Sequence, residues 1–397
     1  MELNPQILIW ARETAGLTVD EAAHALGFKD GQGRTAADRL EAMEVGDEGP
    51  SRSVLLNMAR VYRRSLLVFY LSEPPRIGDR GQDFRRAPSA QTPEYDPTLD
   101  ALIRDVRGRQ GMVKDLLEQT ETKRINYVAS VSMEIPSTEL ARRIRDTLGF
   151  SLADFRRQAT VEAAFNYLRG RIEESGAFVL LSGNLGSYQT NIPSGVFRGY
   201  AIADSVAPFI VVNDQDAHVA WAFTALHELT HLWLGATGLS GSSAGLEIEA
   251  YCNNVAGEVL LPEAEMSELR NLRMGSLQET VGTIAQFASR RKISRALVAY
   301  KLLRVQIITN VRWRELDKYY EDEWASAQAK PTIKEKSDGG PSYYVLKRHR
   351  LGHALLDLVK NSLSEGFLTH TKAGRVLGVK PRNVDPLIYA VGMRGDR

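Results

Sequence analysis

Two histidines and a glutamate in this chain stand at the spacing of a metal-dependent hydrolase. Residues 227–231 read His-Glu-Leu-Thr-His. Four residues make just over one helical turn, so His227 and His231 project from one face and can share a zinc ion. Glu228, one step round the helix, can reach the water that such a metal activates and serve as the general base. The alternative is a chance match on an ordinary helix, because only three positions are fixed.

The surroundings of this motif favour the metal. The preceding residues PFIVVNDQD predict a strand and a turn that lead into the helix. The helix itself is otherwise apolar, with Trp221, Phe223 and Leu229 among its residues. Such a helix is expected to be buried, and buried histidines require polar or metal partners.

A third zinc ligand is available in the next helix, which offers Glu247 and Glu249. They are two residues apart and cannot both face one ion. Glu249 lies on the less polar flank of the helix, so it is the one expected to point inward. Asn253, one turn later, could orient the carboxylate, although a role as a helix-surface amide fits equally well. Cys252 falls on the apolar stripe and is interpreted as a buried small residue instead of a ligand.

The elements around these residues predict a small α+β domain. GAFVLLSG and GYAIADSVAPFIVVN carry strand signals. The metal helix is expected to follow Asp216 as its N-cap and to end at Gly235. The second helix is expected over 247–261, stopping at Pro262.

The two helices together resemble a known family. FTALHELTHLWLG followed by EAYCNNVAGEVLLP is similar to the ImmA/IrrE metallopeptidases, in which an HExxH helix precedes a Glu-x-x-(Ala/Cys)-Asn segment ending in Leu-Leu-(x)-Pro, where the residue x is optional. The resemblance covers about 160–305. It implies a zincin-like, gluzincin-type fold, a zinc ion, and Glu249 as the third ligand. It also implies cleavage of a helix-turn-helix repressor, which relieves repression of stress or mobile-element genes.

The N-terminal residues 1–73 resemble an Xre-type helix-turn-helix domain, with helices expected over 18–26 and 34–44. Arg34, Thr35 and Arg39 are the exposed candidates for DNA contact. However, the turn GFKDGQG is long, and 8 basic against 11 acidic residues give a charge of −3, which opposes phosphate binding. A helical bundle that binds a protein is the open alternative.

The C-terminal residues 341–397 also predict a helix-turn-helix, with a turn at Gly378. This segment holds 10 basic and 4 acidic residues, a charge of +6. Lys372, Arg375, Lys380 and Arg382 stand around the turn, so phosphate contact is physically easier here than at the N-terminus. A solvated basic face on an ordinary helical tail is the alternative.

The 397 residues exceed the usual size of a single core, and 43% hydrophobic with 25% charged residues is typical of a globular protein. We expect a multi-domain, mostly α protein. Its parts are a helical bundle over 1–73, a linker and connecting helix over 74–130, the peptidase domain over 131–310, a linker over 311–340, and a helical module over 341–397. The single cysteine and the lack of a long apolar stretch indicate a cytoplasmic protein without membrane contact. A homodimer is compatible with the sequence.

The leading hypothesis is a zinc endopeptidase with a regulatory role, which cleaves an Xre-like repressor and itself binds DNA. The rival is a DNA-binding transcriptional regulator or antitoxin-like protein whose peptidase domain is a scaffold. Glu228 favours the enzyme, because a scaffold does not need a general base.

Overall fold

The computed structural model describes residues 3–31, 33–75, 96–236, 243–270, 276–329 and 342–389. Parts of the expected linkers over 74–130 and 311–340 lie outside these residues. The described chain is mostly helical with one small sheet and forms two compact units, which supports the predicted multi-domain architecture. The smaller unit holds the N-terminal residues together with 96–105 and 184–190. Within the described residues, no helix combines the length and apolarity needed to cross a membrane.

The N-terminal residues form a bundle of short helices around one core. The helices are α1 (Pro5–Glu13), α2 (Val19–Ala25), α3 (Ala36–Val45), α4 (Arg52–Val61) and η1 (Leu66–Tyr70). Capping boxes at Thr18 and Thr35 begin α2 and α3. The core of this bundle includes the buried residues Ala22, Ala23, Leu26, Leu40 and Met43. Leu17 is half-buried.

The larger unit is built around a three-stranded sheet with the order β1-β3-β2. β1 (Phe178–Leu181) runs parallel to β3 (Phe209–Val212), and β2 (Gly199–Ile202) runs antiparallel to β3. Every residue of the three strands is buried, as their continuous apolar runs predict. β1 and β2 are therefore the two edge strands.

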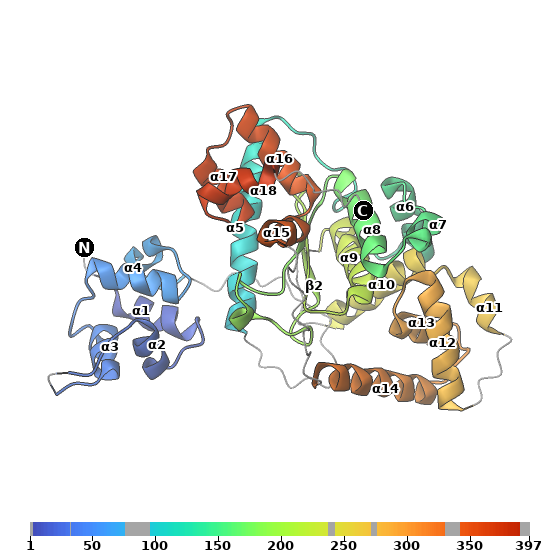
Figure 1. Cartoon of the computed structure of the whole chain (residues 1–397), viewed down its shortest axis with the longest axis horizontal. Coiled ribbons are helices and arrows are strands. Elements are labelled where there is room, and N and C mark those ends of the chain that lie inside the picture. Colours follow the sequence, from blue (N-terminus) through green and yellow to red (C-terminus); the bar gives the residue numbers. More distant parts are fainter. Residues whose placement is uncertain are drawn as a thin grey trace. The chain divides into compact units, whose positions relative to one another are not determined.

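α8 (Val161–Glu174) and α9 (His218–Leu234) pack against this sheet (Figure 1). Beyond them, α10 (Ser243–Leu260) contacts α9, α6 (Ser137–Leu148) contacts α10, and α7 (Leu152–Arg157) contacts α8. α9 contacts α8, α10 and two strands, and so lies at the centre of the unit. Gly235 ends α9 in the left-handed conformation as expected, but the N-cap is Ala217. Asp216 instead accepts the Ala217 N–H through its side chain.

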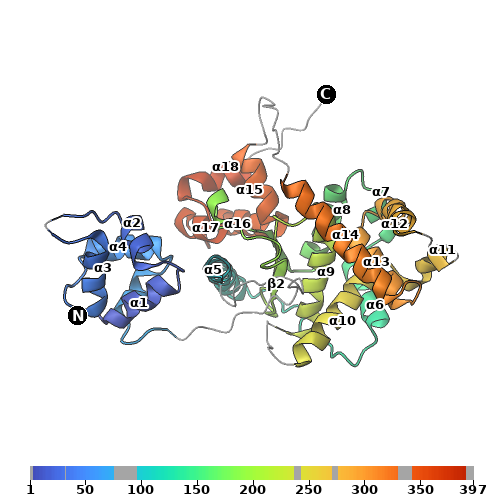
Figure 2. The same ribbon diagram turned by 90° about the horizontal axis from the view of Figure 1, so that it is seen from below.

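Two segments differ from the sequence-based expectation. The helix α5 (Pro97–Gln119), expected to be a solvated connection, buries Val113 and Leu116, and its Lys114 Nζ lies 2.7 Å from Asp204 Oδ2. The expected linker over 311–340 contains α14 (Asn310–Ala329), which packs against two other helices (Figure 2). These are α12 (Leu277–Arg291) and α13 (Arg295–Arg304). In both segments one apolar face of the helix is buried. The charged residues between the apolar positions make this face difficult to recognise in the sequence.

The remaining short elements are η2 (Tyr188–Thr190), η3 (Glu263–Met266) and α11 (Ser267–Arg270). The chain then forms a C-terminal module, drawn in red in Figure 1. The module comprises α15 (Tyr343–Leu351), α16 (His353–Ser364), α17 (His370–Leu377), η4 (Pro381–Asn383) and α18 (Val384–Tyr389). α15 and α16 both contact β1, so the module belongs to the larger unit.

Candidate metal centre

Three side chains from α9 and α10 converge inside the larger unit. His227 Nε2 lies 3.1 Å from His231 Nε2, and the two nitrogens lie 3.1 Å from Glu249 Oε2 and Oε1 respectively. All three residues are buried, with exposed fractions of 1%, 5% and 6%. The four-residue spacing on α9 and the packing of α10 against it together produce this triangle.

The triangle has the dimensions of a zinc site. Ligand atoms about 2.0–2.1 Å from a tetrahedral zinc ion lie roughly 3.3 Å from one another. Two imidazoles and one carboxylate are also the donor set of several open catalytic zinc sites. The side chains present therefore fit one zinc ion with a position left for water or substrate.

The Glu249 carboxylate carries the strongest indication of a missing partner. Both of its oxygens are buried, and neither has a hydrogen bond of acceptable geometry. Burial alone would raise its pKa, but the neighbouring His227 and His231 lower the pKa to about 2. The group is thus an anion at neutral pH, and a buried anion without hydrogen bonds requires a cation.

Asn253 lies behind His227, where it orients the imidazole. Its Oδ1 is 2.9 Å from His227 Nδ1. Because an amide oxygen only accepts, Nδ1 carries the proton and Nε2 presents its lone pair to the centre. The sequence predicted a supporting role for Asn253 toward Glu249, whereas the structure places it on the histidine.

Glu228 is 4% exposed and faces the edge strand β2. At Gly199, a Cβ atom would stand 3.0 Å from Glu228 Oε1 and 2.8 Å from Thr224 Cγ2. A side chain at this position would therefore push the carboxylate or the strand aside. The sequence does not indicate this contact, because a glycine at the start of a strand can have many other roles.

The thiol of Cys252 is closer to the centre than its predicted role as a buried apolar residue implies. Its Sγ and the nearest nitrogens of His227 and His231 all lie within 4.8 Å of one another. Burial raises the pKa of this thiol, which favours the protonated form. The oxygens of Glu249 lie 3.1 Å from the two histidine nitrogens, so Glu249 is the better-placed third ligand.

The other candidates near the motif have different surroundings. Glu247 is exposed, in contrast to Glu249. His218 Nδ1 lies 2.6 Å from Glu162 Oε1, and the Tyr251 hydroxyl donates to the Ile135 carbonyl. Neither group is therefore available to stabilise an oxyanion in this arrangement.

Comparison with known families bears on the same part of the chain. Residues 189–303 match the IrrE N-terminal-like domain of the Peptidase_M78 family. This IrrE N-terminal-like segment contains α9 and α10, and the match indicates a metallopeptidase-like domain. A search of curated proteins and a search of solved structures gave no significant match.

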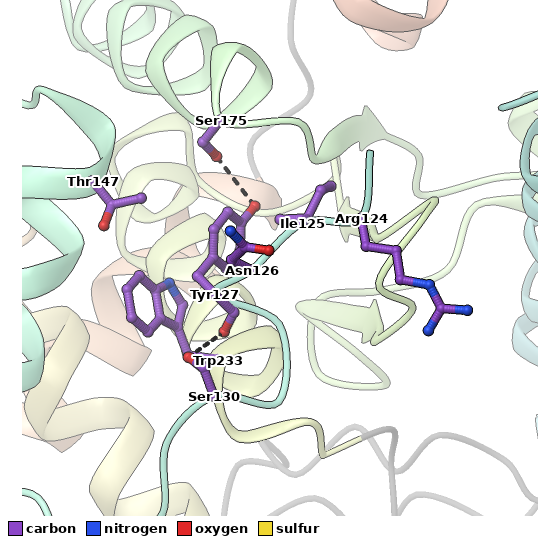
Figure 3. Close-up of a pocket in the computed structure, with 8 residues that line it drawn as sticks. All are labelled: Arg124, Ile125, Asn126, Tyr127, Ser130, Thr147, Ser175 and Trp233. Atoms are coloured by element: carbon purple, nitrogen blue, oxygen red, sulfur yellow. Dashed lines mark hydrogen bonds between the residues drawn. The ribbon is translucent and has the colours of Figure 1, made fainter. Parts of the chain in front are cut away.

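The C-terminal end of α9 in the IrrE N-terminal-like segment is held by residues 124–131. Ala129 and Ser130 donate their N–H groups to the Leu232 and Trp233 carbonyls. Figure 3 shows the Tyr127 ring stacked on Trp233, with centroids 5.2 Å apart, and its hydroxyl turned toward Ser175. A pocket of about 480 Å³ lies over these residues. Because the serine hydroxyls that line this pocket form hydrogen bonds within the protein, we interpret the pocket as part of the contact between residues 124–131 and α9.

The predicted DNA contacts lie in two different environments. In the smaller unit, Arg34 Nη1 lies 2.6 Å from Glu48 Oε1, Thr35 is the N-cap of α3, and Arg39 stands over the Phe28 ring at 5.4 Å. In the C-terminal module, the four basic residues are exposed around α17 and the turn that follows it; they are Lys372, Arg375, Lys380 and Arg382.

Proposed function

We propose that this protein is a zinc-dependent endopeptidase whose metal is held by His227, His231 and Glu249. The observation that carries the proposal is the triangle of donor atoms 3.1 Å apart, together with the two Glu249 oxygens that lack hydrogen bonds. The match of residues 189–303 to a metallopeptidase-like domain supports the same conclusion.

A zinc ion held by these three residues would polarise the scissile carbonyl and lower the pKa of the attacking water to about 7. Glu228 would act as the general base, taking a proton from the attacking water and passing it to the leaving amine nitrogen. Asn253 keeps the proton of His227 on Nδ1, so that Nε2 remains a ligand.

The substrate backbone is proposed to pair with the outer edge of β2. Among the described residues this edge has no strand partner, and β2 packs against α9. An extended peptide added to an edge strand gains main-chain hydrogen bonds. Because Gly199 has no side chain, the Glu228 carboxylate can lie directly against this strand.

The substrate class follows from the family resemblance of the sequence, which implies a helix-turn-helix repressor of the Xre type. The exposed basic residues around α17 support an additional contact with DNA by the C-terminal module. The rival function is a DNA-binding regulator whose peptidase domain is a scaffold. The two functions differ in whether Glu228 is needed.

The decisive test replaces Glu228 with Gln, which keeps the size of the side chain but cannot take the proton. We expect Glu228→Gln to retain about one zinc per chain and to lose cleavage by at least about a hundredfold. Zinc is measured by metal analysis, and cleavage is measured on an Xre-like repressor encoded nearby, with residues 1–73 of this chain as a second substrate. If the variant relieves repression in cells as the wild type does, the scaffold function replaces the enzyme.

The third ligand is tested by a matched pair of glutamates on α10. Glu249→Ala is expected to lower both zinc retention and cleavage, because it removes the anionic ligand. Glu247→Ala is the control, since that residue is exposed on the same helix. His227→Ala should abolish zinc binding. Full zinc occupancy in His227→Ala or in Glu249→Ala would contradict the assignment of that ligand.

A further inference from the structure

The junction between α15 and α16, here called the corner, lies at Gly352 and packs on a buried ion pair in α8. Arg169 and Glu173 of α8 have side chains that are each 4% exposed, and Arg169 Nε lies 3.0 Å from Glu173 Oε1. Both residues come from α8, whereas the backbone groups that they bind come from the C-terminal module. The pair therefore joins two segments that are far apart in sequence.

Each side chain of the pair caps the helix end that carries the opposite partial charge. Glu173 Oε2 accepts the N–H groups of His353 and Ala354, at 3.0 and 3.2 Å, in the first turn of α16. Arg169 donates to the carbonyls of His349 and Arg350 in the last turn of α15. Anions favour helix N-termini and cations favour C-termini, so the corner fits this pair electrostatically.

The same arginine also covers the outer edge of β1. Arg169 Nη2 donates to the Val179 carbonyl of this edge strand. The glycine at the corner, Gly352, has φ +81 and lies directly on the pair. A Cβ atom there would collide with Glu173 Oε1, would lie 2.6 Å from Arg169 Nη2, and would lie 3.0 Å from the Val179 oxygen. The corner thus has no room for a side chain.

The corner continues to the N-terminal end of α9. Arg350 Nη2 lies 2.7 Å from Asp214 Oδ2, and Asp214 belongs to the turn between β3 and α9. The His349 ring lies 6.3 Å from Trp221 of α9, whose indole N–H donates to the Asp216 carbonyl. The C-terminal end of α9 is held separately by residues 124–131. The module therefore contacts the start of the helix that carries His227 and His231.

We propose that the C-terminal module is a built-in control element of the metal centre. Its α15–α16 corner holds the start of α9 in place, and displacement of the corner loosens α9 and weakens metal retention. The part that concerns the metal rests on the proposed function, whereas the part that concerns α9 does not.

The test compares two glycines of the module in the full-length protein. Gly352→Ala creates the collision, while Gly366→Ala is the matched control, because Gly366 has φ +79 but no atom within 4 Å of the added Cβ. Both changes place a side chain at positive φ, but Gly352 has ψ 166, so Gly352→Ala combines backbone strain with the collision against Arg169 and Glu173. Hydrogen exchange is followed in α15, α16, β1 and α9, and zinc loss to a chelator is timed.

We expect Gly352→Ala, relative to Gly366→Ala, to speed exchange in the corner, in β1 and at the start of α9. Zinc should be lost about fivefold faster, at the lower end of the usual coupling between linked sites. Should Gly352→Ala fail to fold, Arg350→Gln removes only the contact with Asp214 and should speed exchange in the first turns of α9.

Equal exchange of α9 in Gly352→Ala and Gly366→Ala would overturn the proposal. Faster α9 exchange with unchanged zinc loss would overturn control of the metal. If instead the wild-type protein binds no zinc, the proposed function fails, while the exchange of α9 still shows whether the corner holds that helix.

Discussion

The N-terminal helices and the C-terminal module both resemble helix-turn-helix segments in sequence, and each contacts a buried arginine–glutamate pair. In the smaller unit the pair is Arg12 and Glu44, with Arg12 Nε 2.8 Å from Glu44 Oε1, and both residues belong to the bundle. At the C-terminal module the pair is Arg169 and Glu173, and both belong to α8 of the peptidase body. The Arg12–Glu44 pair therefore lies within the N-terminal bundle, whereas the C-terminal module depends on side chains of α8.

This difference decides how each region can be tested. A helical segment that owns both partners of a buried ion pair can unfold by itself, because no group elsewhere loses a partner. The helix ends of the C-terminal module are instead capped by Arg169 and Glu173 of α8. Removal of the module would leave these buried charged groups without the backbone partners that they bind. Deletion of the C-terminal module would thus disturb the peptidase body, and point substitutions are the cleaner probe of its surface.

The largest expected effect is loss of the internal pair of the N-terminal bundle. Glu44→Ala removes the carboxylate that pairs with the half-buried Arg12 and should destabilise the bundle by about 1–3 kcal/mol. We expect hydrogen exchange to accelerate throughout α1–α4, while exchange of α8, α9 and α10 and the zinc content stay at wild-type values. Comparable acceleration in α9 would show that the N-terminal bundle is not independent.

A smaller effect is expected for DNA, and it separates the two regions by charge. Substitution of the four exposed basic residues around α17 by Gln should weaken binding to duplex DNA. Each lost phosphate contact should reduce the slope of log K against log salt concentration by about 0.9. The four are Lys372, Arg375, Lys380 and Arg382. The comparison variant Arg34→Gln with Arg39→Gln should change less, because Arg34 already pairs with Glu48.

Filter binding over a salt series measures both variants, with circular dichroism as the control for folding. The N-terminal α3 has further reason to bind DNA weakly, since the carboxylates of Asp30 and Asp38 accept the Ala36 and Thr35 N–H groups at its start. Equal losses in the two variants would return a DNA role to the N-terminal bundle.

The smallest expected effect is a difference in acid sensitivity of the helix caps. Hydrogen bonds from Thr18 and Thr35 lower the pKa of Glu21 and Asp38 below their ordinary values of 4.5 and 3.8. Their stabilisation of α2 and α3 is present above those values and is lost as the pH falls below them. The caps of α15 and α17 are the Ser342 and Thr369 hydroxyls, which do not titrate.

Exchange in α2 and α3 should therefore rise, relative to α15 and α17, as the pH is lowered from 5 to about 3. Glu21→Gln with Asp38→Asn should remove most of this pH dependence. An equal rise in all four helices would indicate that the caps do not set the response.

Much of the candidate centre follows from local sequence. The spacing of His227 and His231 fixes their common face on a helix, and the apolar stripe of α10 distinguishes Glu249 from Glu247. Short apolar runs rich in Val and Ile predicted the strands of the sheet, and the resemblance to Xre-type domains predicted the helices of the N-terminal bundle.

The sequence by itself determined the two helices α9 and α10, the common face of His227 and His231, and the inward position of Glu249, because these depend on residues within a few turns of one another. Only the tertiary structure decided that Asn253 supports His227, that Gly199 lies against Glu228, and that the C-terminal module is seated on α8. Glu173 and the backbone N–H of His353 are 180 residues apart. No local periodicity encodes such a contact, because it forms only where two folded elements bury their charges together.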